Sequence, residues 1–295
     1  MPLRDRAPDP GLFGPGSVTW RVIREPLLVV CGARALLLQA AHPLIAEGVI
    51  EHSSYRSDPW GRLLRTLEWV ALCSFGTTEE ARASCRQVNQ GHAQVQGRLA
   101  RDHATAEHPP GREYTARDRE LLRWVHACFV DTMLVAHDAM IGSLDDGERD
   151  RLVREWNAVA ALMGVPATDR FQSRAEVAEF VATEVASGRV TPGAGSREVA
   201  ATVLAPPLPG LVAHPATRLF ALGTIGLLPA ETRAAYGFGW SPAHDVAHRT
   251  LCAGLRRLHP GLPRELRISP AHDWSVRRVR GALSPPRPAG EDAAA

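Results

Sequence analysis

Apolar residues recur along most of this chain at the three- to four-residue spacing of helices, whereas the alternation typical of strands is scarce. The pattern predicts a first long helix over about 26–53. It is apolar on nearly every face, which is typical of a buried central helix. Pro43 lies inside this stretch, so we expect a kink near His42.

Capping signals predict where further helices begin. Three positions carry side chains that can accept hydrogen bonds from the first free backbone N–H groups of a helix: Asp58, Thr77 (or Thr78) and Thr115. The corresponding helices are expected over about 58–76, from 77 along an apolar stripe to 99, and from 115 to at least 133. Later helices, separated by Pro- and Gly-rich turns, are expected over about 148–163, 174–187, 196–204, 214–226 and 242–258.

Together these elements predict an all-α fold: one multi-helix globular domain over residues 17–283. Residues 1–16 are expected to be a flexible N-terminal segment, and residues 284–295 a disordered C-terminal tail. The chain has 295 residues, of which 45% are hydrophobic, enough for a large core. No uncharged apolar run reaches about 18 residues, and the N-terminus lacks an apolar signal core, so we expect no membrane span and a cytoplasmic location.

Charge and cysteine content exclude several classes of function. The 34 basic residues are all arginine and face 32 acidic residues. No lysine is present to form a Schiff base or to serve a phosphate-binding loop. The near-neutral balance argues against nucleic acid as a partner. Five scattered cysteines predict buried free thiols in a reducing compartment.

Two histidines interrupt apolar helical stripes, at His92 and His126. A buried imidazole must be hydrogen-bonded or ligated, because leaving it unpaired costs about 1–3 kcal/mol. Each residue is therefore either a satisfied core histidine or part of a shared polar or metal centre. The residues alone leave both interpretations open.

The predicted helix over 58–76 places Arg62, Thr66 and Trp69 on one face, as expected for the lining of a pocket. Glu47 lies in the buried first helix, and buried carboxylates are rarely left unpaired. Arg62 is a candidate partner for it. A buried glutamate is also a candidate general base.

Other catalytic motifs are weak. His244 and His248 have the spacing of the zinc-protease pattern H-E-x-x-H, but aspartate replaces the glutamate that this pattern needs as a base. The chain contains no glycine-rich nucleotide-binding motif and no G-x-S-x-G motif, so nucleotide binding and serine hydrolysis have no support.

A set of short signatures resembles the rubber-oxygenase family, which includes latex-clearing protein and the fungal oxygenase of the mycophenolic acid pathway. The resemblance covers about residues 18–270. Its signatures are LQAAHPLIAEGV at 38–49, HS at 52–53, DP at 58–59, RLLRT at 62–66, FG at 75–76, His92, YTA at 114–116 and WVH at 124–126.

This resemblance implies a globin-like all-α fold that binds haem b, with His92 as the axial ligand of the iron. The distal signature of the family falls on Arg62, Arg65 and Thr66, and its second histidine on His126. Where some relatives carry a lysine that can bind the iron, this chain has Arg65. A guanidinium stays protonated, so the sixth coordination position is expected to be open or water-bound.

The resemblance also places a catalytic glutamate in the stretch from His42 to Glu51. Glu47 is the expected residue, and Glu51 is the alternative. With Arg62 and Thr66, Glu47 completes the expected catalytic set, and Trp69 is expected to line the cofactor pocket.

Rubber-cleaving members are secreted and longer, and this chain shows neither a signal peptide nor the extra length, so polyisoprene is not the expected substrate. The implied function is oxygenation of a small apolar substrate with dioxygen. A natural product or alkene-like compound is the expected substrate class, and a homodimer is compatible with this interpretation. The alternatives are a non-catalytic protein that binds haem or an apolar ligand, and a haem-free metalloenzyme that uses histidines and a carboxylate.

Overall fold

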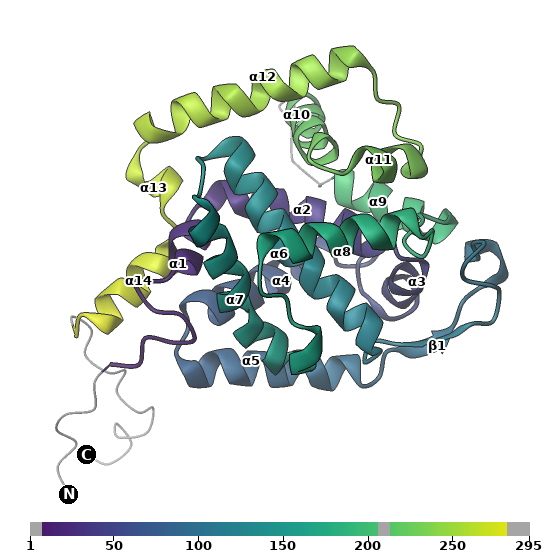
Figure 1. Cartoon of the computed structure of the whole chain (residues 1–295), viewed down its shortest axis with the longest axis horizontal. Helices are drawn as coiled ribbons and strands as arrows, with labels where there is room; N and C mark the ends of the chain where they lie inside the picture. The colour runs from purple at the N-terminus through teal and green to yellow at the C-terminus, as the bar shows by residue number, and fades with distance from the viewer. Residues whose placement is uncertain (1–7, 206–212, 282–295) are drawn as a thin grey trace, which may run out of the picture.

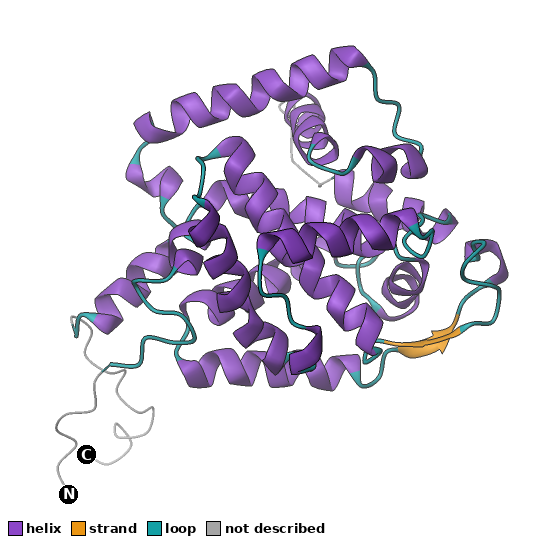
Figure 2. Ribbon diagram, viewed as in Figure 1, coloured by secondary structure: helices purple, strands orange, loops and turns teal. Residues whose placement is uncertain are grey.

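The computed structural model describes residues 8–205 and 213–281, and most of this part of the chain is helical (Figures 1 and 2). The helices of the first half are α1 (Val18–Ile23), α2 (Pro26–Ala40), α3 (Pro43–His52), α4 (Pro59–Phe75), α5 (Thr78–His92) and α6 (Arg119–Met140). The second half contains α7 (Asp146–Leu162), α8 (Arg174–Ala186), α9 (Ala194–Leu204), α10 (Ala213–Gly226), α11 (Ala230–Tyr236), α12 (Pro242–Leu258), α13 (Arg264–Arg267) and α14 (Pro270–Val279). Three short 3-10 turns are η1 (Arg101–His103), η2 (Ala167–Asp169) and η3 (His259–Gly261).

The core forms where α2 packs against α6, and the other helices surround this pair (Figure 1). Trp20, Trp124 and Trp156 are fully buried, and the Trp124 indole N–H donates to the carbonyl of Leu38 in α2 at 3.2 Å. The predicted all-α single domain is therefore confirmed. All five cysteines are free and buried, also as predicted.

The expected kink near His42 is a full break between α2 and α3, which are bent by 110°. Pro43 lacks the N–H that would continue α2 and instead occupies the first position of α3. The His42 ring caps α3, its Nδ1 accepting from the Leu44 backbone N–H at 3.3 Å. Within the described residues, no single helix is long and apolar enough to span a membrane; α2 and α3 pass that test of length and composition only as this bent pair.

Two of the predicted capping sites are confirmed. Asp58 accepts from the backbone N–H of Gly61 at the start of α4. Thr77 and Glu80 form a complete capping box on α5.

Two predicted boundaries are wrong, both because of a short β-hairpin. Helix α5 ends at His92 and does not continue to 99, since residues 96–98 form β1 (Gln96–Arg98). This strand pairs antiparallel with β2 (Glu113–Thr115), in the register that sets Gly97 opposite Tyr114. Thr115 thus belongs to a strand, and α6 begins after Asp118. The hairpin and the segment that it carries, residues 99–112 between the two strands, project from one side of the helical body (Figure 2).

The predicted terminal segments are described only in part. Residues 1–7 and the predicted tail 284–295 lie outside the described residues. Of the predicted flexible segment 1–16, residues 8–16 contact the domain. The Asp9 carboxylate accepts from the backbone N–H and the hydroxyl of Thr78, and Phe13 stacks on Trp156 at a centroid distance of 6.1 Å.

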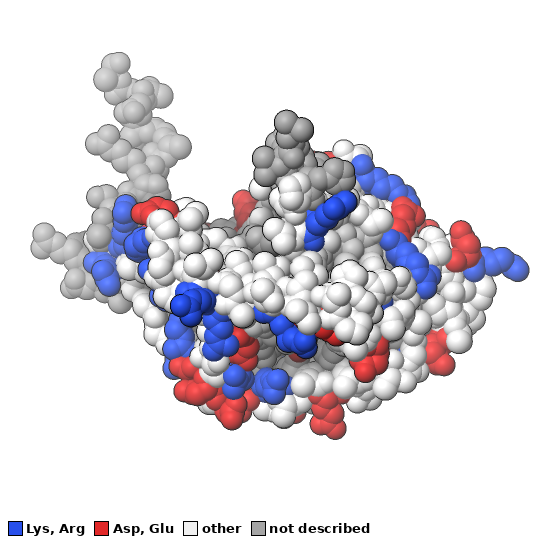
Figure 3. Space-filling view, turned by 90° about the horizontal axis from the view of Figure 1, so that it is seen from above, with Lys and Arg blue, Asp and Glu red and all other residues white. Residues whose placement is uncertain are grey.

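A buried ion pair joins the central helices. Arg34 of α2 is only 2% exposed. Its guanidinium donates to Asp131 at 2.7 Å and Thr132 at 2.8 Å, both on α6, and to the Leu227 carbonyl at 2.7 Å. On the surface, arginines and acidic residues are interspersed over the described part of the face in Figure 3.

We expect Asp131→Ala to lower the free energy of unfolding by about 3–5 kcal/mol, because it leaves the Arg34 guanidinium buried without its counter-ion. The measurement is urea unfolding followed by circular dichroism. Glu79→Ala is the matched control: it removes the carboxylate of the exposed Arg86–Glu79 pair and should cost at most about 1 kcal/mol. Equal losses in the two variants would contradict the role given to Arg34.

The cap at His42 also predicts a pH dependence. Burial, together with the neighbouring His108 ring 4.8 Å away, lowers the pKa of His42 to about 3 from its usual 6.5. Below pH 6.5 the His42 imidazole therefore binds a proton in the unfolded chain but not in the folded chain. The free energy of unfolding thus falls as the pH falls. By pH 5 this group should cost about 2 kcal/mol relative to pH 7. His42→Asn keeps a capping side chain but cannot titrate, so urea unfolding of the variant should lack this loss; an equal loss in both proteins would refute the prediction.

Candidate functional site

A cavity of about 740 Å³ lies among helices α2 to α7, with Tyr114 and Ala116 at one edge. Its lining is mainly apolar, and its volume is in the range of sites that hold cofactors and small molecules. Three aromatic side chains form part of one wall. Trp69 of α4 packs on Phe129 of α6 at 5.6 Å between centroids, and Phe129 stacks on Trp156 of α7 at 6.4 Å.

The structure brings six predicted site residues together around this cavity. They come from α4, the end of α5 and α6, and are Arg62, Arg65, Thr66, Trp69, His92 and His126. The α4 residues share one face because their spacing follows the helical period. The packing of α4 on α5 then places His92 against the same space.

His92 is the last residue of α5 and is half-buried. Neither of its ring nitrogens has a hydrogen-bond partner among the described residues, although the ring lines the cavity. Burial lowers the pKa of His92, and the charge of Arg117 lowers it further. The ring is therefore a neutral imidazole at physiological pH, with a lone pair available to a metal.

His126 lies deeper, on α6, and stacks on Phe171 at 5.9 Å. Burial lowers its pKa to about 4, and the Asn157 side chain offsets this only in part. Its Nε2 atom has no hydrogen-bond partner. The cavity is thus bordered by two neutral imidazoles, on different helices.

The two arginines of α4 have different environments. Arg62 is half-buried, and its guanidinium forms no hydrogen bond or ion pair with another described residue. Burial, with a contribution from Arg65, lowers its pKa. Arg65 is 60% exposed and is held by Asp58 at 3.2 Å and Ser54 at 2.9 Å. Arg62 therefore presents an unpaired positive charge to the cavity, whereas the charge of Arg65 is already paired.

Thr66 donates its hydroxyl proton to the Arg62 carbonyl at 3.0 Å. This bond, typical of threonine inside a helix, leaves the hydroxyl oxygen able to accept a hydrogen bond from a ligand. In this geometry Thr66 does not itself donate to a cavity ligand.

Glu47 and Glu51 are not among the lining residues. The Glu47 carboxylate is 2% exposed; it contacts His103 Nδ1 at 2.5 Å and accepts from the Ala100 N–H at 3.3 Å. Its predicted pairing with Arg62 is wrong, because α3 turns this side chain toward the segment carried by the hairpin. Glu51 instead accepts from the Tyr114 hydroxyl at 2.5 Å.

The lining also includes polar side chains that were not predicted as site residues, among them Gln39, His52 and Tyr114. Gln39 Nε2 is buried without a hydrogen-bond partner. The sequence signal for it was an amide inside the apolar run of α2. The YTA signature includes Tyr114, but the sequence did not place it at the cavity, because its position depends on the hairpin.

The histidine–carboxylate metal centre is not assembled. Among residues 8–205 and 213–281, no three His, Cys, Asp or Glu side chains lie close enough to hold a metal ion. In the zinc-protease-like segment, His244 contacts the Ser241 hydroxyl at 2.9 Å, and His248 lies 3.6 Å from the Cys252 sulfur.

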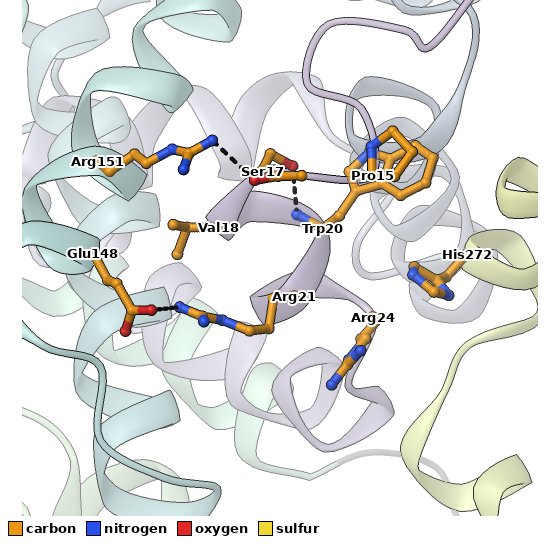
Figure 4. A pocket seen from close by; sticks show the side chains of 10 residues that line it. Pro15, Ser17, Val18, Trp20, Arg21, Arg24, Glu148, Arg151 and His272 are labelled. Carbon is orange, nitrogen blue, oxygen red and sulfur yellow. Dashed lines mark hydrogen bonds and ion pairs between the residues drawn. The ribbon is translucent and has the colours of Figure 1, made fainter. Parts of the chain in front are cut away.

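A second, smaller cavity of about 300 Å³ lies between α1, α7 and α14 (Figure 4). It is lined by three arginines, but Arg21 is paired with Glu148 at 2.6 Å and Arg151 with Glu155 at 2.9 Å. It contains none of the predicted site residues, so the larger cavity is the candidate site.

Residues 20–257 match the family described as "ER-bound oxygenase mpaB/B'/Rubber oxygenase, catalytic domain". The uncharacterized proteins Mb2261 of Mycobacterium bovis and Rv2237 of Mycobacterium tuberculosis are each 26% identical to this chain over 230 residues, which is 76% of this chain and 86% of theirs. No solved structure matches at a significant level. The matched segment includes every residue that lines the larger cavity. The resemblance seen in the sequence is confirmed: this chain belongs to the mpaB and rubber oxygenase family and carries its oxygenase catalytic domain.

Proposed function

We propose that this oxygenase uses haem b and dioxygen to oxidise a small apolar substrate of the alkene or natural-product type. The family supports the oxygenase part of this proposal. One observation carries the haem part: a neutral imidazole without a partner, His92, and an arginine without a counter-ion, Arg62, line the same mainly apolar cavity.

The residues present fit such a group. Haem b is a flat apolar macrocycle with two carboxylates, and its iron takes a histidine as proximal ligand. His92 would supply that ligand, and Arg62 would pair with a carboxylate through charge-assisted hydrogen bonds. The wall formed by Trp69, Phe129 and Trp156 would pack against apolar surface, and Gln39 offers an unused donor.

When bound, haem supplies the binding and reduction of dioxygen; the protein supplies position, polarity and protons. Thr66 would accept a hydrogen bond from a polar ligand, and His126 would border the pocket as a second neutral imidazole. Arg65, held by Asp58 and Ser54, would keep positive charge beside the cavity without ligating iron.

We expect purified protein titrated with hemin to develop a Soret band that changes on addition of dithionite, with one hemin bound per chain. His92→Ala should lose the spectrum of a histidine-ligated iron. His248→Ala is the control, because His248 lies on α12 outside the cavity. A wild-type protein that takes up no hemin would overturn the haem proposal, and an unchanged spectrum in His92→Ala would overturn the ligand assignment.

The two arginines should differ in their effect on hemin binding. Arg62→Gln removes a charge-assisted contact worth about 1.5–3 kcal/mol, so hemin affinity should fall about 10- to 100-fold. Arg65→Gln should leave affinity within about twofold, because that guanidinium is already paired at the surface. Competition for hemin with apomyoglobin measures both, and equal effects would contradict the assigned roles.

A further inference from the structure

A hydrogen bond at the edge of the cavity connects a buried group to solvent. Tyr114 lines the cavity and is 4% exposed. Its hydroxyl donates to Glu51 Oε2 at 2.5 Å. The Glu51 side chain is 43% exposed and does not line the cavity. The two side chains together therefore reach from the cavity to bulk water.

The fold leaves little room around this contact. Gly97 of β1 lies opposite Tyr114 of β2, and a Cβ atom at Gly97 would lie 2.7 Å from Glu51 Oε2 and 2.8 Å from the Tyr114 hydroxyl oxygen. On the α3 side, a Cβ at Gly48 would touch the Tyr114 ring at 3.4 Å. The absence of a side chain at Gly97 is what allows the phenol and the carboxylate to meet.

A second cavity-lining group lies beside the same carboxylate. The His52 ring lines the cavity, and its Nε2 atom is 3.7 Å from Glu51 Oε2. The ring also meets Tyr114 edge-on, at 6.5 Å between centroids. Glu51 thus faces two groups that border the cavity and can both carry a proton.

Tyr114 remains protonated at physiological pH. Burial raises its pKa, and the adjacent carboxylate of Glu51, with a smaller contribution from Glu47, raises it further. A phenol in this state passes on a proton only while it takes up another, which is the behaviour of a relay group.

We propose that Glu51 and Tyr114 conduct protons between solvent and the cavity; this rests on the function proposed above. The Glu51 carboxylate takes a proton from a hydronium ion or a buffer acid in the solvent. The Tyr114 hydroxyl then turns, accepts that proton on its oxygen and releases its own to an acceptor in the cavity. One proton has moved, no electron has moved, and both side chains are restored. The reverse sequence carries a proton outward.

This assignment selects Glu51 over Glu47 as the carboxylate that serves the cavity. Glu47 is the more deeply buried of the two, but its carboxylate is held by His103 and the Ala100 N–H. Glu51 touches a lining residue directly and is open to water.

The chain contains a matched control pair. The Tyr55 hydroxyl donates to Glu198 Oε1 at 2.5 Å, and Tyr55 is 4% exposed, like Tyr114. Neither residue lines the cavity. Tyr55→Phe and Glu198→Gln therefore remove the same type of hydrogen bond without affecting the proposed route.

The test is the binding of hydrogen cyanide to the ferric, hemin-loaded protein, followed by stopped-flow absorbance. Cyanide binds iron as the anion, so its proton must leave the cavity during binding. Carbon monoxide binding to the dithionite-reduced protein releases no proton and reports access alone. We expect Glu51→Gln and Tyr114→Phe to slow cyanide binding about 100-fold, while carbon monoxide binding stays within twofold and Tyr55→Phe and Glu198→Gln change neither rate. Added formate should restore the rate of Glu51→Ala, because the space left by the side chain opens to solvent.

The outcomes separate the two proposals. Cyanide rates within twofold of wild type in both variants, with hemin bound through His92, would overturn the proton route alone. Equal slowing of cyanide and carbon monoxide would also overturn it, since access and not proton transfer would then have changed. A wild-type protein that binds no hemin would overturn the proposed function, and this inference with it.

Discussion

The break between α2 and α3 determines the geometry of the candidate site. An uninterrupted helix over 26–53 would carry residues 43–52 away from the hairpin and the cavity. Pro43 cannot donate the hydrogen bond that continuation requires, and the His42 ring caps the new helix in its place. The resulting turn of 110° lays α3 beside the cavity. Gly48 and His52 then face the cavity, and Glu47 faces the segment between the two strands.

Much of this arrangement follows from local rules in the sequence. The helix starts at Asp58 and Thr77 and the interruption at Pro43 depend on side chains within a few residues of the backbone that they affect. The clustering of Arg62, Thr66 and Trp69 follows from helical periodicity alone. The hairpin could not be predicted, because three-residue strands carry no alternation that can be distinguished from a loop. The error at Thr115 and the missed position of Tyr114 both result from it.

The spacing of residues along a helix does not predict which partner a site residue meets in the folded protein. The sequence indicated that Glu47 is buried and must have a partner, and both are true, but the partner, His103, is 56 residues away on the hairpin segment. Only the tertiary structure decides which of two carboxylates, one helical turn apart, faces a given neighbour. The contrast between Arg62 and Arg34 has the same origin. Arg34 is fully buried and pairs with Asp131 on α6, whereas the half-buried Arg62 forms no ion pair with another described residue.

The segment between the two strands contacts α3 at two points. His108 packs on His42 at the start of the helix, and His103 holds Glu47 one turn further on. The walls of the cavity, by contrast, come mainly from α4 to α7. On the proposed assignments, most of the wall that would contact a substrate and the carboxylate that would supply protons are therefore encoded in different stretches of the chain. Insertions or deletions between residues 99 and 112 would therefore act first on the position of α3 and its Glu51, and would leave the part of the wall that α4 to α7 supply unchanged.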